Sequence, residues 1–409
     1  MKAFVLSPFI QQLIRCHLDP MIARIFIFLL FLIILPDVYL DLHYLRKKEN
    51  YAWWKRLSWW LPALLMLAYT IKMAAEPDFI PDNQAWIDNY LLLLCLLIVP
   101  KALFAICSVI GLFFCRLCEK RRNWGNLLGL VLGLLVIYAV VYGSVIGVRK
   151  LNVKHVDVSF SDLPASFDGY RIVLWSDAHV GSYLQSRRPI LERAVDSIRA
   201  QRADMVVFTG DLQNLQPSEL YPFVGLLSSI KAKDGVYSVL GNHDYGGYVH
   251  ADAAVRAANE RETISRQRQC GWTVLLNEHR PVYRGRDSIV VAGEENDGLP
   301  PYPARGDIRK TLRGVGDGAF IVLLQHDPSA WRRHVLPESK AQLTLSGHTH
   351  GGQISVLGFR PSKLKYAEDW GLYRAGDRCL YVTAGLGGLI PFRFGVPPEI
   401  VVITLHRQK

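Results

Sequence analysis

Residues 127–148 form an unbroken run of 22 uncharged, mostly apolar residues, and this run limits the possible folds of the chain more than any other feature. An α-helix needs about 20 such residues to cross the roughly 30 Å of hydrocarbon in a bilayer. A helix also satisfies its backbone hydrogen bonds internally, as a chain in hydrocarbon must. The sequence therefore predicts a transmembrane helix over residues 127–148.

Three further apolar runs precede this one, at residues 21–40, 57–71 and 91–115. Arg24 and Asp37 lie near the ends of the first run, and we expect their side chains to extend toward the headgroups. In the third run Pro100 is compatible with a kinked transmembrane helix, and Lys101 is expected as an interior or snorkelling charge. We predict four spans, so residues 1–150 form a helical membrane block.

The charges of the connecting segments predict the orientation of this block. The first connection carries Arg46, Lys47, Lys48, Lys55 and Arg56, the third carries Arg116, Lys120, Arg121 and Arg122, and the second carries Lys72, Glu76, Asp78, Asp82 and Asp88. Lys and Arg accumulate on the cytoplasmic side of membranes, so the first and third connections are predicted inside. Residues 151–409 are then predicted to be extracytoplasmic, in the periplasm of a bacterial inner-membrane protein. Arg149 and Lys150 would lie outside against this rule, and the topology inverts if one weak span does not insert.

The formal net charge of +11 does not indicate a nucleic-acid surface. Residues 1–150 hold 16 of the 47 basic and 9 of the 36 acidic side chains, so the basic excess lies mostly beside the apolar runs. There it is explained by topology and by contact with anionic headgroups, and we expect no nucleic-acid binding. Cys270 and Cys379 are the two cysteines after residue 150, so one disulfide could form but no cysteine framework.

Beyond residue 150 short β-rich runs alternate with helical patterns. Strands are predicted at residues 171–175, 205–209, 236–240, 273–276, 288–292, 320–324, 342–345, 380–383 and 400–405, and helices at 189–201, 217–230 and 250–267. Alternating strands and helices followed by a strand-rich half favour an α/β fold of two packed β-sheets flanked by helices. The predicted domains are therefore the membrane block, 1–150, and a second domain, 151–409.

Nearly every polar residue of a type that binds metal ions comes directly after a predicted strand. These residues are Asp177, His179, Asp211, Asn242, His243, His326, His348 and His350. Because the carboxyl ends of parallel strands line a common crevice, five separate segments are expected to meet there. Carboxylates, an amide oxygen and imidazoles form a mixed set that suits Mn, Zn or Fe and not Ca. Two such ions about 3.5 to 4 Å apart could clamp a phosphate and activate water.

These blocks resemble the signature of a known family. Asp177-Ala178-His179, Gly210-Asp211, Gly241-Asn242-His243-Asp244, His326 and Gly347-His348-Thr349-His350 are similar in order and spacing to the calcineurin-like metallophosphoesterase superfamily. The continuation at residues 351–353 and the stretch 393–400 look like its bacterial branch of the YkuE type. The resemblance covers residues 165–405, does not extend to the membrane block, and implies an αββα sandwich.

The resemblance also implies a role for each residue. Asp177, His179 and His350 would hold one divalent metal ion, Asn242, His326 and His348 a second, and Asp211 would bridge both. His243 would contact the scissile phosphate and protonate the leaving group, with Asp244 orienting it. Asn214 stands where many relatives carry Asp or Asn. Arg393 could either contact a substrate phosphate or form a structural pair.

The function that follows is metal-dependent hydrolysis of phosphomonoesters or phosphodiesters by a membrane-anchored enzyme. A membrane tether favours lipid-linked phosphates or pyrophosphates as substrates, by analogy alone. The alternative is a catalytically silent metal-binding membrane sensor or scaffold. An intact His243 argues against this alternative, because a silent site has no need for the acid.

Overall fold

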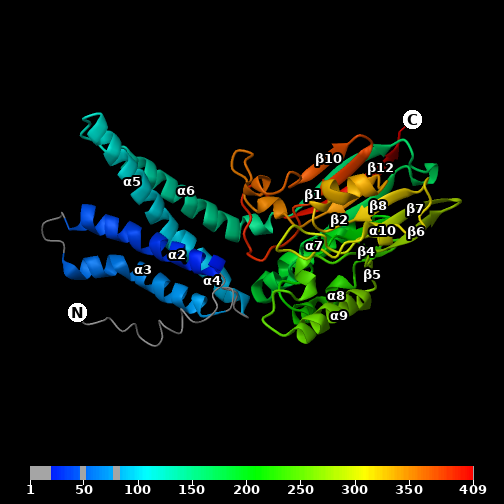
Figure 1. Cartoon of the computed structure of the whole chain (residues 1–409), viewed down its shortest axis with the longest axis horizontal. Helices are drawn as coiled ribbons and strands as arrows, with labels where there is room; N and C mark the ends of the chain where they lie inside the picture. The colour runs from blue at the N-terminus through cyan, green and yellow to red at the C-terminus, as the bar shows by residue number, and fades with distance from the viewer. Residues whose placement is uncertain (1–19, 47–51, 77–82, 409) are drawn as a thin grey trace. The chain divides into compact units, whose positions relative to one another are not determined.

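A computed structural model of the chain describes residues 20–46, 52–76 and 83–408. The chain divides into two compact units, Met1–Tyr142 and Gly143–Lys409 (Figure 1). The domain boundary expected after residue 150 stays a prediction. The side chain of Arg24 and the residues Lys47, Lys48, Asp78 and Asp82, which entered the predictions of spans and orientation, lie outside the described part of the chain.

The first unit consists of apolar helices. They are α2 (Pro20–Leu40) with the π-helical turn η1 (Asp41–Leu45), α3 (Trp53–Ala74), α4 (Gln84–Leu93) with the π-helical turn η3 (Leu94–Ile98), α5 (Val99–Leu117) and α6 (Gly125–Val145). Four continuous helical segments are long and apolar enough to cross a membrane: Ile25–Leu45, Trp53–Ala74, Gln84–Leu117 and Gly125–Arg149. Each of the four predicted spans is therefore a helix in the described residues.

The third span accommodates Pro100 by widening the helix directly before it. Proline has no backbone N–H, and its ring clashes with the carbonyl group four residues earlier, here that of Leu96. The π-helical turn η3 contains Leu96, and its wider spacing relieves this clash. The kink expected at the proline thus takes the form of a π-helical turn.

Asp37 does not extend toward the headgroups, which corrects the expectation from the sequence. Its side chain is fully buried, and its two oxygens lie 3.0 and 3.1 Å from the Nζ of Lys101. The ammonium group of Lys101 also lies 4.7 Å from the centre of the Trp59 ring. Charges within a membrane span are costly unless they are paired, so the interior charge expected at Lys101 is neutralised by Asp37.

Helix α6 packs closely on α5 through glycines spaced four residues apart. The glycines are Gly125, Gly129 and Gly133, and Cβ atoms added to them would lie 2.0, 2.7 and 3.3 Å from the nearest atoms of α5. Small residues at this spacing let two membrane helices approach until their backbones touch. The apolar run that predicted the last span therefore also contains the glycines through which this helix packs on α5.

The second unit contains two six-stranded sheets. The first has the order β1 (Asn152–Phe160), β12 (Glu399–Arg407), β2 (Tyr170–Trp175), β3 (Met205–Phe208), β4 (Val236–Ser238) and β5 (Thr273–Val274). The second has the order β10 (Gly371–Ala375), β11 (Arg378–Val382), β9 (Leu343–Ser346), β8 (Phe320–Leu324), β7 (Asp287–Gly293) and β6 (Glu278–Arg284). Strands β2, β3 and β4 are parallel neighbours, as are β7, β8 and β9.

Helices cover the outer faces of the two sheets (Figure 1). They are α7 (Arg188–Ala200), α8 (Val224–Leu227), α9 (Ala253–Gln269), α10 (Ile308–Thr311) and α11 (Leu336–Glu338). Strand β2 shows how both faces become buried. Ile172 and Leu174 belong to the core between the sheets, whereas Val173 and Trp175 pack in the outer core that contains Leu191 of α7. Alternate strand residues point to opposite faces, so this run is apolar throughout. The predicted two-sheet α/β fold is confirmed.

Three details of the predicted domain were wrong or incomplete. Strands β1, β6 and β10 were missed. The helix expected at residues 217–230 is a 3₁₀ segment, Pro217–Phe223, followed by the short α8, because Pro222 in its interior cannot donate a helical hydrogen bond. Cys270 and Cys379 are free thiols buried in different cores, so the disulfide considered for them is not formed.

Candidate metal centre

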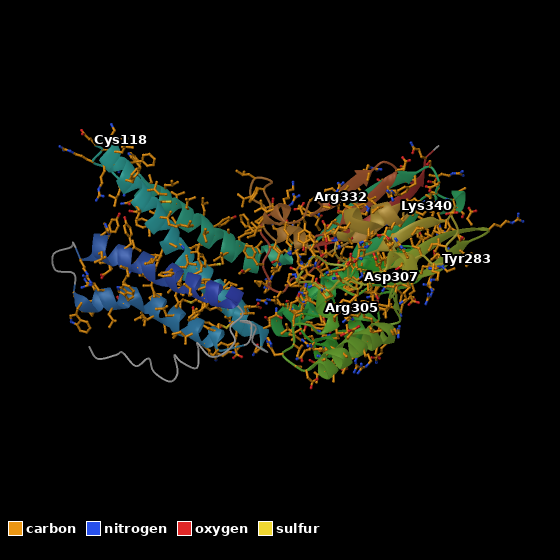
Figure 2. All side chains as sticks on the ribbon, in the orientation of Figure 1. Cys118, Tyr283, Arg305, Asp307, Arg332 and Lys340 are labelled. Atoms are coloured by element: carbon orange, nitrogen blue, oxygen red, sulfur yellow. The ribbon has the colours of Figure 1, made fainter. Side chains whose placement is uncertain are left out.

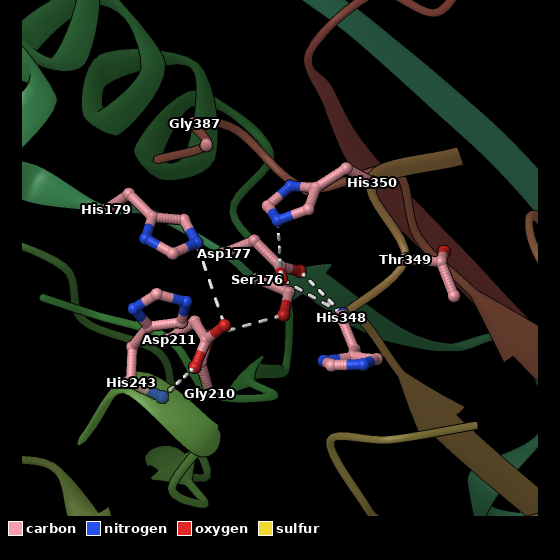
Figure 3. Close-up of polar contacts among 12 residues, drawn as sticks. Ser176, Asp177, His179, Gly210, Asp211, His243, His348, Thr349, His350 and Gly387 are labelled. Carbon is pink, nitrogen blue, oxygen red and sulfur yellow. Dashed lines mark hydrogen bonds and ion pairs between the residues drawn. The ribbon is translucent and has the colours of Figure 1, made fainter. Parts of the chain in front are cut away.

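The candidate ligands gather at the carboxyl ends of strands from both sheets. Asp177 and His179 follow β2, Asp211 follows β3, Asn242 follows β4, His326 follows β8, and His348 and His350 follow β9. Ligand atoms within 4.8 Å of one another form three overlapping groups: Asp177 with His179 and His350, His179 with Asp211 and His243, and Asp211 with His326 and His348. Figure 3 shows the side chains of Asp177, His179, Asp211, His243 and His350 around one space, with His348 beside Asp177. The expected convergence of five segments therefore occurs, across two sheets and not within one.

The backbone at the centre is held in a strained conformation. Asp177, His179, Asp211, His348 and His350 all have positive φ, between 46° and 72°, and they make up half of the ten such non-glycine residues in the described chain. Each such residue costs about 1 to 3 kcal/mol and persists only where its surroundings fix it. Here the Asp177 N–H donates to the Gly210 carbonyl at 2.9 Å. Strain concentrated in this way indicates side chains aimed at a common target.

Glycines before the ligands permit the close approach that the sequence predicted. A Cβ atom added to Gly241 would lie 2.2 Å from Oδ1 of Asp211, and one added to Gly347 would lie 2.3 Å from Oδ2 of Asp177. Contacts below 3 Å essentially never occur for real Cβ atoms, so neither position accepts a larger residue without displacing a carboxylate. The two glycines therefore set how near the carboxylates come to the neighbouring loops.

Several buried ligand atoms have no hydrogen-bond partner. They are Nδ1 and Nε2 of His179, Nδ1 of His350 and Oδ1 of Asn242. The nearest carboxylate oxygens to His179 Nε2 and His350 Nε2 lie at 3.6 and 3.7 Å, on Asp211 and Asp177. Buried polar atoms are normally paired, and leaving one unpaired costs about 1 to 3 kcal/mol. Divalent cations between these atoms would satisfy them, so the residues present fit metal ions.

Two histidine rings are held in place by polar partners. Nδ1 of His326 lies 2.6 Å from the carbonyl oxygen of Thr209, which leaves Nε2 facing Asp211 at 3.2 Å. Nε2 of His348 lies 2.8 Å from the hydroxyl of Tyr366 and 3.4 Å from Oδ2 of Asp327, which leaves Nδ1 toward His326 at 3.3 Å. Partners of this kind aim and tune metal-binding imidazoles.

Sequence reasoning missed Asp327 and Tyr366. Asp327 directly follows the candidate ligand His326 after β8, and this position could have indicated that it lies near the centre. Tyr366 lies in a loop between β9 and β10, and no pattern in the sequence connects it to His348.

Burial and mutual interaction shift the pKa values of the ligands in opposite directions. Burial raises the pKa of Asp177 to about 6 and lowers the pKa values of His179 and His348 to about 3 and about 4. Burial would lower the pKa of His326, but the Asp211 carboxylate outweighs it and raises that pKa to about 10. Metal binding needs neutral imidazoles and ionised carboxylates, so His179 and His348 are already in the binding form at neutral pH, while His326 would release a proton.

The side chains of His243 and Asp244 have different hydrogen-bond partners. Nδ1 of His243 lies 2.6 Å from the carbonyl oxygen of Asn214, and its ring stacks on Tyr248 with centroids 4.2 Å apart. The Asp244 carboxylate instead accepts backbone N–H groups of Gly241 and Asp211, both at 2.9 Å. Asp244 therefore orders the loops around His243, and the carbonyl of Asn214 contacts the imidazole itself.

The sequence left two roles open for Arg393, contact with a substrate phosphate or a structural pairing, and the structure supports the structural role. Its side chain is 2% exposed, and its guanidinium donates to the carbonyl oxygens of His350, Gly385 and Gly387. Burial lowers the pKa of Arg393 to about 10. A guanidinium that is fully engaged with backbone carbonyls fixes the loop that carries His350.

Two family models match this chain. The model described as probable calcineurin-like phosphoesterase, transmembrane domain, matches residues 23–148, and the model described as calcineurin-like phosphoesterase matches residues 170–352. The first match corrects the expectation that the family resemblance ends before the membrane block.

Individual relatives agree with both matches. The uncharacterized metallophosphoesterase YkuE of Bacillus subtilis is 32% identical over 61% of this chain and 83% of its own length. A transmembrane protein with metallophosphoesterase domain from Danio rerio is 32% identical over 71% of this chain and 66% of its own length. An uncharacterized metallophosphoesterase of Campylobacter jejuni is 27% identical over 95% of this chain and 100% of its own length. The chain therefore belongs to the calcineurin-like metallophosphoesterases and is an integral membrane protein of the phosphoester hydrolase class.

Proposed function

We propose that this protein hydrolyses a phosphomonoester or phosphodiester with two divalent metal ions. The observation that carries the proposal is a set of buried polar atoms without hydrogen-bond partners on His179, His350 and Asn242, together with the convergence of His179 and His350 on the carboxylates of Asp177 and Asp211. Such a set has no structural use without cations and matches the needs of phosphate ester hydrolysis.

The proposed ligand assignment is the one that the family resemblance implies, and the groups of converging atoms support it for every ligand except Asn242. Asp177, His179 and His350 hold one ion, Asn242, His326 and His348 hold the other, and Asp211 lies between them. Bound ions would polarise the phosphate and lower the pKa of bound water. The mixture of nitrogen and oxygen ligands favours Mn, Fe or Zn.

His243 is proposed as the proton donor to the leaving oxygen. Its Nδ1 faces the Asn214 carbonyl at 2.6 Å, a contact that fixes a proton on Nδ1 and leaves Nε2 on the opposite side of the ring. In the imidazolium form Nε2–H can protonate an oxygen as its bond to phosphorus breaks. Stacking on Tyr248 limits rotation of the ring.

The test is hydrolysis of a chromogenic bis-aryl phosphate by the purified full chain with manganese. His243→Ala is expected to abolish turnover while leaving the metal content unchanged, because His243 is not in the proposed ligand set. His406→Ala, which changes an exposed histidine on β12, is the matched control and should remain active. A metal-loaded but inactive wild type would instead support the silent sensor or scaffold.

Orientation and substrate class are also proposals. The basic first and third connections support an extracytoplasmic catalytic unit, in the periplasm of a bacterial inner-membrane protein. Anchoring near a bilayer supports lipid-linked phosphates or pyrophosphates as substrates. A reporter fused after Lys409 that is active only in the periplasm tests the first proposal, and a screen of lipid phosphates tests the second.

A further inference from the structure

The second unit exposes a dense apolar patch on one short segment. The segment, residues 354–365, is called the apolar loop here and carries Ile354, Val356, Leu357, Phe359 and Leu364, all between 37% and 103% exposed. Apart from Val145 and Ile146 in the last span, the other large exposed apolar residues of this unit are separate in the sequence, at Leu184, Tyr221, Val255, Tyr283 and Leu372. Single exposed apolar residues need no explanation, but a contiguous patch marks a contact surface.

The loop is a defined turn and not a loose segment. Val356 and Phe359 exchange backbone hydrogen bonds at 3.0 and 2.9 Å, which closes a two-residue tip formed by Leu357 and Gly358. Both tip residues have positive φ, 51° and 82°. Asn or Asp normally precedes glycine in such a turn, since other side chains are strained there. A strained leucine that is 103% exposed has no packing role within the chain, so its stabilising contact lies outside it.

Backbone hydrogen bonds connect the apolar loop to the end of the last membrane span. Ser355 N–H donates to the Phe394 carbonyl at 2.7 Å, and the preceding residue, Arg393, donates its N–H to the Gly143 carbonyl at 3.2 Å. Phe392 packs on the same glycine, since a Cβ atom on Gly143 would lie 2.3 Å from its ring. Gly143 lies six residues before the end of the span Gly125–Arg149, or about 9 Å along a helix. The base of the loop is therefore connected by hydrogen bonds to the last turns of this apolar helix.

The charges of the loop suit an anionic lipid surface. Lys363 and Lys365 are exposed and have no ion-pair partner among the described residues, and no acidic residue occurs in the loop. Arg360 is different, because its guanidinium is paired with Asp369 at 2.7 Å. Bulky apolar side chains beside lysines are the composition of segments that lie in a membrane interface.

We propose that the apolar loop inserts its tip, Leu357 with Val356 and Phe359, into the headgroup region of the membrane that anchors the protein. The loop leads directly into Tyr366, whose hydroxyl lies 2.8 Å from Nε2 of the candidate ligand His348. Lys365 lies 4.5 Å from the ring of Tyr302, which itself packs against His348. A docked loop therefore holds one wall of the metal centre at the depth of lipid headgroups. This inference goes beyond the proposed function and depends only on membrane anchoring.

The test is site-specific photocrosslinking in the full chain, reconstituted in vesicles of phosphatidylcholine and phosphatidylglycerol. Benzoylphenylalanine replaces Leu357 in one protein and Tyr283 in the other. Tyr283 is the matched control because it is 71% exposed and lies at the turn between β6 and β7 (Figure 2). The proposal predicts a lipid adduct at position 357 that exceeds the adduct at 283 several-fold.

Three results would overturn the proposal. They are the absence of a lipid adduct at 357, equal adducts at both positions, and a crosslink from 357 to a second copy of the chain. A second experiment tests the contribution of charge with the double variant Lys363→Glu, Lys365→Glu. This variant should lower the yield of the lipid adduct at position 357 in vesicles that contain phosphatidylglycerol, and should not lower it in vesicles of phosphatidylcholine alone. An unchanged adduct in both would refute the electrostatic part. Photocrosslinking detects contact with lipid and does not require turnover. Its outcome is therefore independent of whether the proposed hydrolysis occurs.

Discussion

Nδ1 of His326, at the end of β8 in one sheet, lies 2.6 Å from the carbonyl oxygen of Thr209, at the end of β3 in the other. A backbone group of the first sheet thus aims a candidate metal ligand of the second. The centre is complete only when the two sheets pack face to face, so metal binding and folding of this unit are coupled.

His326→Ala should remove one ligand and its orienting contact while leaving the other candidate group of Asp177, His179 and His350 intact. We expect loss of turnover and a fall of about one metal ion per chain, because a two-metal site missing one ligand loses the weaker ion first. Elemental analysis of the purified full chain measures this. Full retention of metal by the variant would contradict the assignment of His326.

Asp244→Asn should disorder the loops around the centre. The carboxylate accepts backbone N–H groups of Asp211, Leu212 and Gly241 at 2.9 to 3.0 Å, and an amide would turn an N–H toward at least one of them. Hydrogen bonds to a charged group contribute about 1.5 to 3 kcal/mol, so we expect lower stability together with weaker metal binding. Asp317→Asn, at an exposed carboxylate, is the control, and equal melting temperatures of the two variants would refute this role.

Arg393→Met should leave the carbonyl group of Gly387 buried without a donor and should remove one of the two donors to the carbonyl group of His350, which Gln353 N–H also contacts. Each unpaired buried group costs about 1 to 3 kcal/mol, so a clear drop in melting temperature is expected. Displacement of His350 should also weaken metal binding, seen as a smaller rise in melting temperature when manganese is added. Arg309→Met, which changes a largely exposed arginine, should leave both readouts unchanged. Turnover lost without any change in stability would instead indicate contact with substrate.

The pH dependence of stability should include a contribution from His334. Its ring lies 3.0 Å from Asp297 and 3.1 Å from Glu294, and these carboxylates outweigh burial and raise its pKa to about 9. A pKa above the unfolded value of about 6.5 means a contribution fully present below pH 6.5 and lost as the pH rises through 9, at most about 3 kcal/mol. His334→Gln should therefore be less stable than wild type at pH 6, and the difference in melting temperature should shrink by pH 10. A difference that grows with pH would contradict this account.

The sequence predicted the interior of the fold better than its edges. The three missed strands, β1, β6 and β10, are all sheet edges. Pro281 in β6 removes a ladder donor, and β1 exposes several of its side chains, so neither run has the apolar pattern of a central strand. Strand β1 also pairs with β12, at the far end of the domain, and local patterns carry no information about that partner.

At the metal centre the sequence predicted the candidate ligands but not the residues that hold them in place. Asp177, Asp211 and His348 follow strands whose apolar runs are strong, which is why their convergence could be expected. Tyr366 and Asn214 act through a loop hydroxyl and a backbone carbonyl, and their positions depend on tertiary packing. The ion pair between Asp37 and Lys101 joins residues that are 64 positions apart in the sequence, so local sequence patterns could not predict it either.

Metal titration of the stripped full chain tests the central claim most directly. Chelated protein is reconstituted with increasing manganese, and bound metal and hydrolysis of a chromogenic phosphodiester are measured on the same samples. We predict that hydrolysis is absent without metal and reaches its maximum at about two ions per chain, with Asp211→Asn failing at every occupancy because both ions lose a shared ligand. Hydrolysis that survives chelation, or saturates with Asp211→Asn as it does with wild type, would contradict a two-metal centre at these residues.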